Sequence, residues 1–123
     1  MHELDSHKLL DETRVREIRD LFRRSNASAF KRIIDKLDSD LVQFADALHK
    51  HVESAPVDDI KRMTHSLKGS SRTLGAEALG EMFVDLEILA GMGDIAAVNN
   101  CYIENQSLIE QSLHALRQFD IAP

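Results

Sequence analysis

The segment "HSLKGSSRTLG" brings together His65, Lys68 and Gly69 within little more than one helical turn. A nucleophilic histidine must be accessible, with one ring nitrogen free to attack and the other donating a hydrogen bond that fixes the tautomer. A nearby lysine can neutralise the charge on a transferred phosphoryl group. A glycine inside a helix costs about 1 kcal/mol relative to alanine, and the simplest reason for it is another molecule approaching the backbone. The spacing therefore favours an accessible, reactive histidine with a cation beside it, and a surface histidine without a function is the alternative interpretation.

Helix geometry predicts which way this histidine faces, because each residue advances by about 100°. His65 and Gly69 fall on the side opposite the apolar stripe, so both are predicted to face solvent. The stripe itself is predicted to face the core, and it consists of Ile60, Met63, Leu67, Ser71 and Leu74. Cationic side chains on the same helix suit a transient anion on the imidazole. These cations are Lys61, Arg62, Lys68 and Arg72.

The following segment, "EALGEMFVDLEILA", is predicted to supply the group that orients His65. Glu87 lies on the flank of that helix, and it would reach His65 if the two helices are antiparallel neighbours across Gly75. Val84 and Ile88 are predicted to lie on its outer face with Gly80, where they form a small apolar surface for a docking protein. Exposed apolar residues without any function are the alternative interpretation.

Helical spacing appears in every long segment, and alternation of period two is absent almost everywhere. We predict helices over residues 11–24, 28–53, 57–73 and 77–90, and one last helix carrying an apolar stripe from Ile95 to Phe119. Short connectors between the last four favour an all-α, antiparallel up-down four-helix bundle with an additional N-terminal helix across one end or side. Asn105 and Ser112 fall on the last apolar stripe, and the sequence alone does not explain them.

The composition suits one domain over residues 1–123, and the net charge of −6 disfavours nucleic-acid binding. No apolar run approaches about 18 residues and no signal peptide is recognisable, so neither a membrane span nor secretion is expected. The single Cys101 favours a reducing compartment, and we expect a cytoplasmic location. The basic cluster in residues 14–24 is interpreted as a solvated helix face, with a partner-docking patch as the alternative.

A metal-binding bundle is a further alternative, because the chain has six histidines: His2, His7, His49, His51, His65 and His114. Di-iron bundles use Glu-x-x-His pairs, but no glutamate here precedes a histidine by three residues. The side chains of His49 and His51 diverge on a helix because they are two residues apart. We therefore expect no metal ion and no cofactor.

The stretch "HSLKGSSRTLGAEALGEMFVDLE" is similar to the signature of histidine-containing phosphotransfer (HPt) domains, roughly HxLKGxxxxxGxxxLxxxxxxLE. The resemblance implies that His65 is phosphorylated on its imidazole, that Lys68 assists and that Gly69 admits the partner. The position of Glu87 holds a polar residue that hydrogen-bonds the histidine in some members. The residues that match at the family's spacing are His65, Leu67, Lys68, Gly69, Gly75, Leu79, Leu86 and Glu87.

The resemblance implies a phosphorelay intermediate that accepts a phosphoryl group from a receiver-domain aspartate and passes it to another. Its expected partners are receiver (response-regulator) domains and a hybrid sensor histidine kinase, and the shuttle is expected to be monomeric. The sequence has neither a GxxxxGK[ST] motif nor a kinase motif set, so no kinase activity of its own is expected. Whether the chain should be classed as an enzyme stays open. The alternative function is a non-catalytic module that sequesters a receiver through Gly69, Val84 and Ile88.

Overall fold

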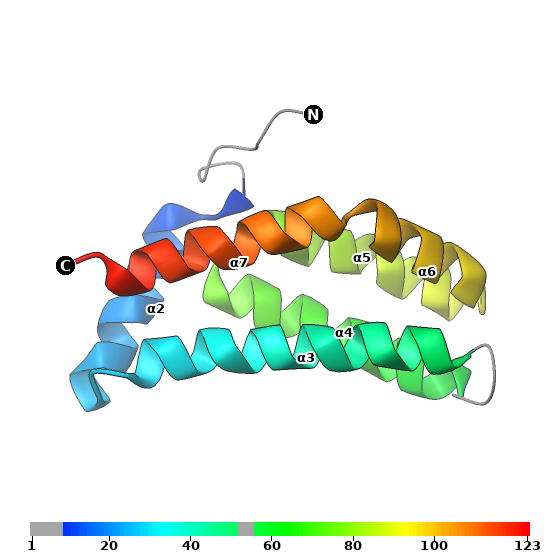
Figure 1. Ribbon diagram of the computed structural model, residues 1–123, viewed down its shortest axis with the longest axis horizontal. Helices are drawn as coiled ribbons and strands as arrows, with labels where there is room; N and C mark the ends of the chain where they lie inside the picture. Colours follow the sequence, from blue (N-terminus) through cyan, green and yellow to red (C-terminus); the bar gives the residue numbers. More distant parts are fainter. Residues whose placement is uncertain (1–8, 52–55) are drawn as a thin grey trace.

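The computed structural model describes residues 9–51 and 56–123, which form helices and no strand. The long helices run alternately up and down the molecule, and the first crosses one end (Figure 1). The predicted all-α bundle is thereby confirmed, although the predicted end of the second helix, at residue 53, lies outside the described residues. The helices are α2 (Glu12–Ser25), α3 (Ala29–His51), α4 (Val57–Leu74), α5 (Glu77–Gly91), α6 (Ile95–Glu104) and α7 (Gln106–Ile121).

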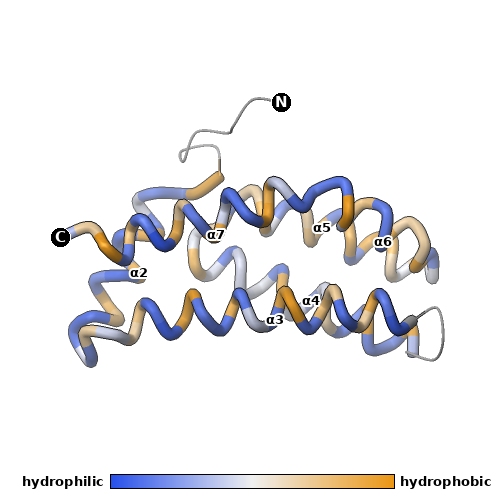
Figure 2. Tube along the Cα trace, viewed as in Figure 1, coloured by the Kyte–Doolittle hydropathy of each residue, from blue (hydrophilic) through white to orange (hydrophobic). Residues whose placement is uncertain are grey.

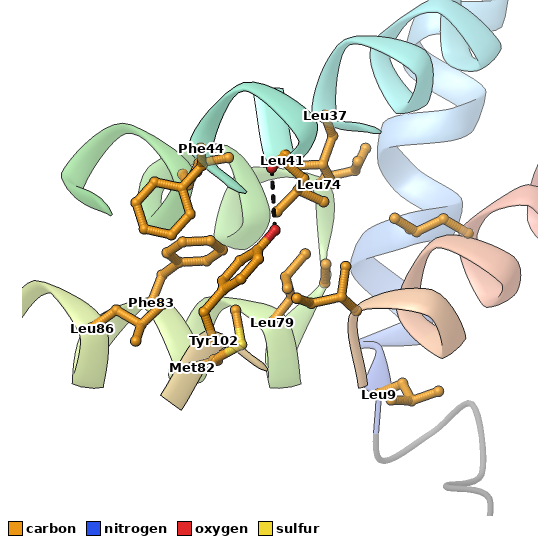
Figure 3. Packing of buried hydrophobic residues seen from close by; sticks show 14 of the residues in the cluster. Leu9, Leu37, Leu41, Phe44, Leu74, Leu79, Met82, Phe83, Leu86 and Tyr102 are labelled. Carbon is orange, nitrogen blue, oxygen red and sulfur yellow. Dashed lines mark hydrogen bonds between the residues drawn. The ribbon is translucent and has the colours of Figure 1, made fainter. Parts of the chain in front are cut away.

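Aromatic side chains from three helices meet in the core of the bundle (Figure 3). The ring of Phe44 lies edge-on to Phe83 and Tyr102, with centroid distances of 5.5 Å and 5.1 Å. The Tyr102 hydroxyl donates a hydrogen bond to the Leu41 carbonyl at 3.1 Å, and burial raises the pKa of Tyr102 to about 12. Hydrophobic and hydrophilic segments alternate along the helices, as the helical spacing requires (Figure 2). The core therefore ties α3, α5 and α6 together.

Gly75 ends α4 and sets the turn that returns the chain along α5. It has a left-handed backbone with φ 88°, which glycine adopts without the strain that other residues incur. A Cβ at this position would lie 2.7 Å from Val15 Cγ2, so the packing of α2 against this turn also requires a residue without a side chain. The carbonyl of Gly75 accepts a hydrogen bond from the Asp11 amide at 2.9 Å. The turn makes α4 and α5 antiparallel neighbours, as predicted.

The basic cluster in residues 14–24 is not simply a solvated helix face, so that interpretation is wrong in part. Arg19 Nη1 donates to the Phe119 carbonyl at 3.2 Å, and Arg23 Nη1 donates to the Ala122 carbonyl at 3.3 Å. The last carbonyls of a helix lack partners within the helix and carry partial negative charge, which attracts cations. These two arginines therefore hold α2 against the C-terminal end of α7.

The prediction of a single last helix is wrong, because this segment of the chain breaks at Asn105 into α6 and α7. Asn105 has φ −104° and ψ 17°, and its side-chain amide donates to the Cys101 carbonyl at 2.8 Å. An asparagine side chain that bonds to a nearby backbone carbonyl competes with the regular helical pattern.

Ser112 is fully buried, its hydroxyl has no hydrogen-bond partner in the described residues, and nothing in the structure explains its presence.

None of the helices within residues 9–51 and 56–123 is long and apolar enough to cross a membrane. The buried apolar side chains of these residues form a core cluster to which every helix from α2 to α7 contributes. The bundle therefore provides a rigid frame for side chains on its outer surface.

Candidate functional site

His65 projects outward from α4, with 75% of its side chain exposed. The opposite face of the same helix is buried, with Ile60 fully inaccessible and Leu67 only 3% exposed. This confirms the orientation predicted from helix geometry. The imidazole is accessible to another protein while its helix is fixed by the core.

Glu87 on α5 lies beside His65 because α4 and α5 are antiparallel neighbours. Glu87 Oε2 is 2.7 Å from His65 Nδ1, and Glu87 Oε1 accepts a hydrogen bond from Lys68 Nζ at 2.8 Å. The hydrogen bond from Lys68 lowers the pKa of the Glu87 carboxyl, burial opposes this shift, and the His65 contact adds to it. The carboxyl group is therefore ionised at neutral pH and bridges the lysine and the histidine.

The Glu87 contact determines which ring nitrogen of His65 is free. An ionised carboxylate only accepts hydrogen bonds, so a short contact to Nδ1 requires a proton on that nitrogen. In the neutral ring the lone pair then lies on Nε2, which points away from Nδ1. The arrangement presents Nε2 as the nucleophilic atom.

Gly69 leaves an open backbone patch one turn from His65. A Cβ at Gly69 would meet no atom within 4 Å, so packing inside this molecule does not require a glycine there. The residue also lies on the wall of a groove of about 360 Å³ between α3 and α4. The sequence could not reveal this groove, because it depends on how two helices pack. Its other lining residues are Ile33, Lys36, Leu37, Asp40, Ser70, Thr73 and Leu74.

The cations predicted around His65 do not all gather over its ring. Lys68 is 21% exposed and is paired with Glu87. Arg62 pairs with Asp59 on its own helix, with 2.9 Å between Nη2 and Oδ1. Lys61 is exposed on the same helix. The structure thus brings Lys68 into the site and leaves Lys61 and Arg62 at its margin.

The apolar surface predicted on α5 does not extend to Gly80 at the N-terminal end of the helix, but it continues beyond Ile88 to Met92 at the C-terminal end. Gly80 is buried against α4, since a Cβ there would lie 2.9 Å from Arg72 Cγ, and Val84 is half-buried. Close packing of α4 against α5 accounts for this correction. Ile88 is 58% exposed, and Met92, one turn further along, is 73% exposed. Sequence reasoning missed Met92, although its spacing from Ile88 is a helical signal.

Groups of three or more His, Cys, Asp or Glu side chains that could hold a metal ion are absent from the part of the chain that the structure describes. His49 and His114 are both exposed, on α3 and α7 respectively. His2 and His7, and the side chain of His51, lie outside the described residues.

A family model for the Hpt domain matches residues 17–119, which is most of the chain. No curated protein and no solved structure shows significant similarity to it. The chain therefore belongs to the Hpt domain family, as the resemblance of the "HSLKG" segment implied. Hpt domains act in phosphotransfer of the two-component type and interact with receiver domains in phosphorelays. The matched range contains His65, Lys68 and Glu87.

Proposed function

We propose that this chain is a phosphorelay intermediate that accepts a phosphoryl group on His65 from a receiver-domain aspartate and passes it to the aspartate of another receiver. The observation that carries the proposal is the exposed imidazole whose Nδ1 is 2.7 Å from the Glu87 carboxylate. That contact leaves Nε2 as an accessible nucleophile in a protein of the Hpt family.

The transfer uses a lone pair and no external energy source. The lone pair on Nε2 forms the new N–P bond, the O–P bond of the phosphoaspartate breaks, and the aspartate carboxylate leaves with its electron pair. The Nδ1 proton stays on the ring, so the phosphorylated ring is cationic and the Glu87 carboxylate balances its charge. The same steps in reverse deliver the phosphoryl group to a second receiver. Phosphoryl transfer depends mostly on positioning and charge stabilisation, which this site provides.

The partner surface is proposed to surround His65 on α4 and α5. Gly69 would admit the rim of a receiver's active site, and the exposed Ile88 with the half-buried Val84 would provide apolar contact. Lys61, Arg62 and Arg72 would contact the partner at the margin. The partners are the receiver domains of response regulators and of a hybrid sensor histidine kinase. Because each must reach the same histidine in turn, the shuttle is proposed to act as a monomer.

Phosphoryl transfer from labelled receivers tests the proposal. Receivers from the source cell are phosphorylated with label and mixed with the wild type, His65→Gln and His114→Gln, where His114 is an exposed histidine on another helix. We expect label on the wild type and on His114→Gln, lost in acid and stable in alkali, and none on His65→Gln. Label on His65→Gln at the wild-type level would overturn the assignment.

The labelling experiment, together with binding and signalling assays of His65→Ala, distinguishes the relay from the alternative function, a non-catalytic module that sequesters a receiver. In that case no receiver would label the chain, and His65→Ala would bind receivers with the affinity of the wild type. Equal signalling by His65→Ala in cells would complete the argument against transfer.

A further inference from the structure

Lys61 lies on α4, four residues before His65, and both side chains are exposed to solvent. Residues four apart on a helix lie on the same face, with their Cβ atoms about 5–6 Å apart. Helical side chains also lean toward the N-terminus of their helix, so the imidazole of His65 extends over the turn that carries Lys61. The long lysine side chain can therefore reach a group that is bound to the ring.

The ammonium group of Lys61 has no carboxylate partner among residues 9–51 and 56–123. Asp58 is exposed three residues earlier on α4 and makes no ion pair with it. Every other lysine in this part of the chain pairs with an aspartate or glutamate carboxylate, at distances of 2.7 to 3.0 Å. These paired lysines are Lys31, Lys36, Lys50 and Lys68. Lys61 thus carries a positive charge that no neighbouring carboxylate in the described residues neutralises.

The neighbouring helix explains why Lys61 lacks a partner. Because α4 and α5 are antiparallel, Glu87 on α5 reaches both His65 and Lys68. One turn further along α5 corresponds to one turn back along α4, where Lys61 lies. The residue one turn after Glu87 is Gly91, which has no side chain, and a Cβ there would meet no atom within 4 Å. A carboxylate therefore holds Lys68, whereas α5 offers nothing to hold Lys61.

A phosphoryl group on Nε2 of His65 carries about two negative charges when it is fully ionised. Lys68 is only 21% exposed, and its Nζ already donates to Glu87 Oε1 at 2.8 Å, so much of its charge is balanced within the site. Phosphoryl transfer is accelerated mainly by positioning and by charge stabilisation of the phosphoryl oxygens. An unpaired cation on the turn over which the ring extends supplies such stabilisation, and Lys61 has this position.

We propose that Lys61 is a further phosphoryl-binding residue, whose ammonium group contacts the phosphoryl oxygens on Nε2 of His65 and stabilises their charge. Lys61 forms no covalent bond and exchanges no proton in this step. The Nε2 lone pair forms the N–P bond, and the O–P bond of the donor phosphoaspartate breaks with its electron pair on the aspartate. The assignment rests on the proposed phosphotransfer function, to which it adds a residue outside the contacts of Glu87.

Titration of the phosphohistidine by phosphorus-31 NMR tests the placement of Lys61. Phosphoramidate phosphorylates histidine without any receiver: Nε2 attacks phosphorus, the P–N bond of the donor breaks and ammonia leaves. The signal of phosphorylated His65 is identified by its absence from His65→Gln. A cation about 5 Å away in water favours the dianion by roughly 0.5 pH unit. We therefore expect Lys61→Gln to raise the titration midpoint of the phosphoryl group by about 0.5 pH unit and to slow phosphorylation roughly threefold.

Two comparison variants and a change of salt separate charge from other effects. Lys61→Arg keeps a cation and should retain the wild-type midpoint. Lys50→Gln is the matched control, because Lys50 pairs with Asp46 at 2.9 Å on α3, and it should leave both midpoint and rate unchanged. Exposed charges are screened within about 3 Å in 1 M salt, so the shift caused by Lys61→Gln should fall to about 0.1 pH unit there.

An unchanged midpoint in Lys61→Gln would overturn the proposal, and so would an equally large shift in Lys61→Arg. Either result would leave the relay intact if receivers still label His65. Failure of every receiver to label His65, with the shift in Lys61→Gln present, would instead contradict the relay and leave Lys61 beside the phosphoryl group.

Discussion

Replacing Gly69 with leucine should make the protein more stable and a poorer phosphoryl acceptor. Gly69 is an exposed residue inside α4, and a Cβ there would meet no atom within 4 Å. Leucine is a good helix former, whereas glycine costs about 0.8–1 kcal/mol in a helix interior. We therefore expect the free energy of unfolding to rise by about 0.5–1 kcal/mol and the midpoint of thermal unfolding by roughly 2–4 °C.

The same side chain should hinder a receiver. Leucine at this position would fill space that is open in the wild type, beside the groove between α3 and α4. Forcing extra atoms into a close-packed contact typically costs about 1–3 kcal/mol. If that cost is added to the free energy of the transition state for transfer, transfer to His65 should slow by roughly 5- to 160-fold.

The assay combines urea unfolding with transfer from a labelled receiver that phosphorylates the wild type. Ala96→Leu is the control, because Ala96 is exposed on α6, which carries none of the residues assigned to the site, and should leave transfer unchanged. Transfer at the wild-type rate by a folded Gly69→Leu protein would refute the idea that Gly69 admits the partner. A lower stability of Gly69→Leu would refute the reading that this glycine has no structural role.

Three further variants test the fold and the charge of the site. Gly75→Ala should lower the free energy of unfolding by about 2–4 kcal/mol, measured with urea, because a Cβ at φ 88° is strained and would lie 2.7 Å from Val15 Cγ2. Tyr102→Phe should cost about 1 kcal/mol, by the same measurement, through loss of the buried hydrogen bond to Leu41. The pKa of Glu87 is lowered by folding, so its stabilisation should be complete above its ordinary value of 4.5 and be lost as the pH falls through the lowered value. Glu87→Gln should therefore flatten this part of the acid-unfolding profile.

The sequence predicted those parts of the site that depend on one helix or on one turn. The direction of His65 follows from the apolar spacing of α4, and its 75% exposure agrees with that spacing. The contact with Glu87 also followed, because Gly75 ends one helix and makes the next an antiparallel neighbour. Each of these predictions rests on local geometry, in which the helical period decides where a side chain points.

The remaining features depend on contacts between distant segments, which a periodic pattern does not contain. Arg19 appeared solvated, but its side chain reaches a carbonyl at the end of α7, 100 residues away. Gly80 appeared exposed, yet the close approach of α4 buries it against Arg72. Asn105 interrupts an otherwise continuous stripe by bonding to the Cys101 carbonyl, and polarity on an apolar face is the one signal that pointed to it.

Gly69 and Gly75 show how the structure assigns different causes to one residue type. Gly75 is required by the fold twice over, through its positive φ and through the space that Val15 occupies. Gly69 has neither constraint: it lies within a regular helix, its surroundings are open, and alanine would stabilise the helix there. A residue that weakens its own helix without any gain in packing requires a cause outside the folded chain. A partner that approaches the α4 backbone beside His65 is such a cause, so the stability and the transfer rate of Gly69 variants should change in opposite directions.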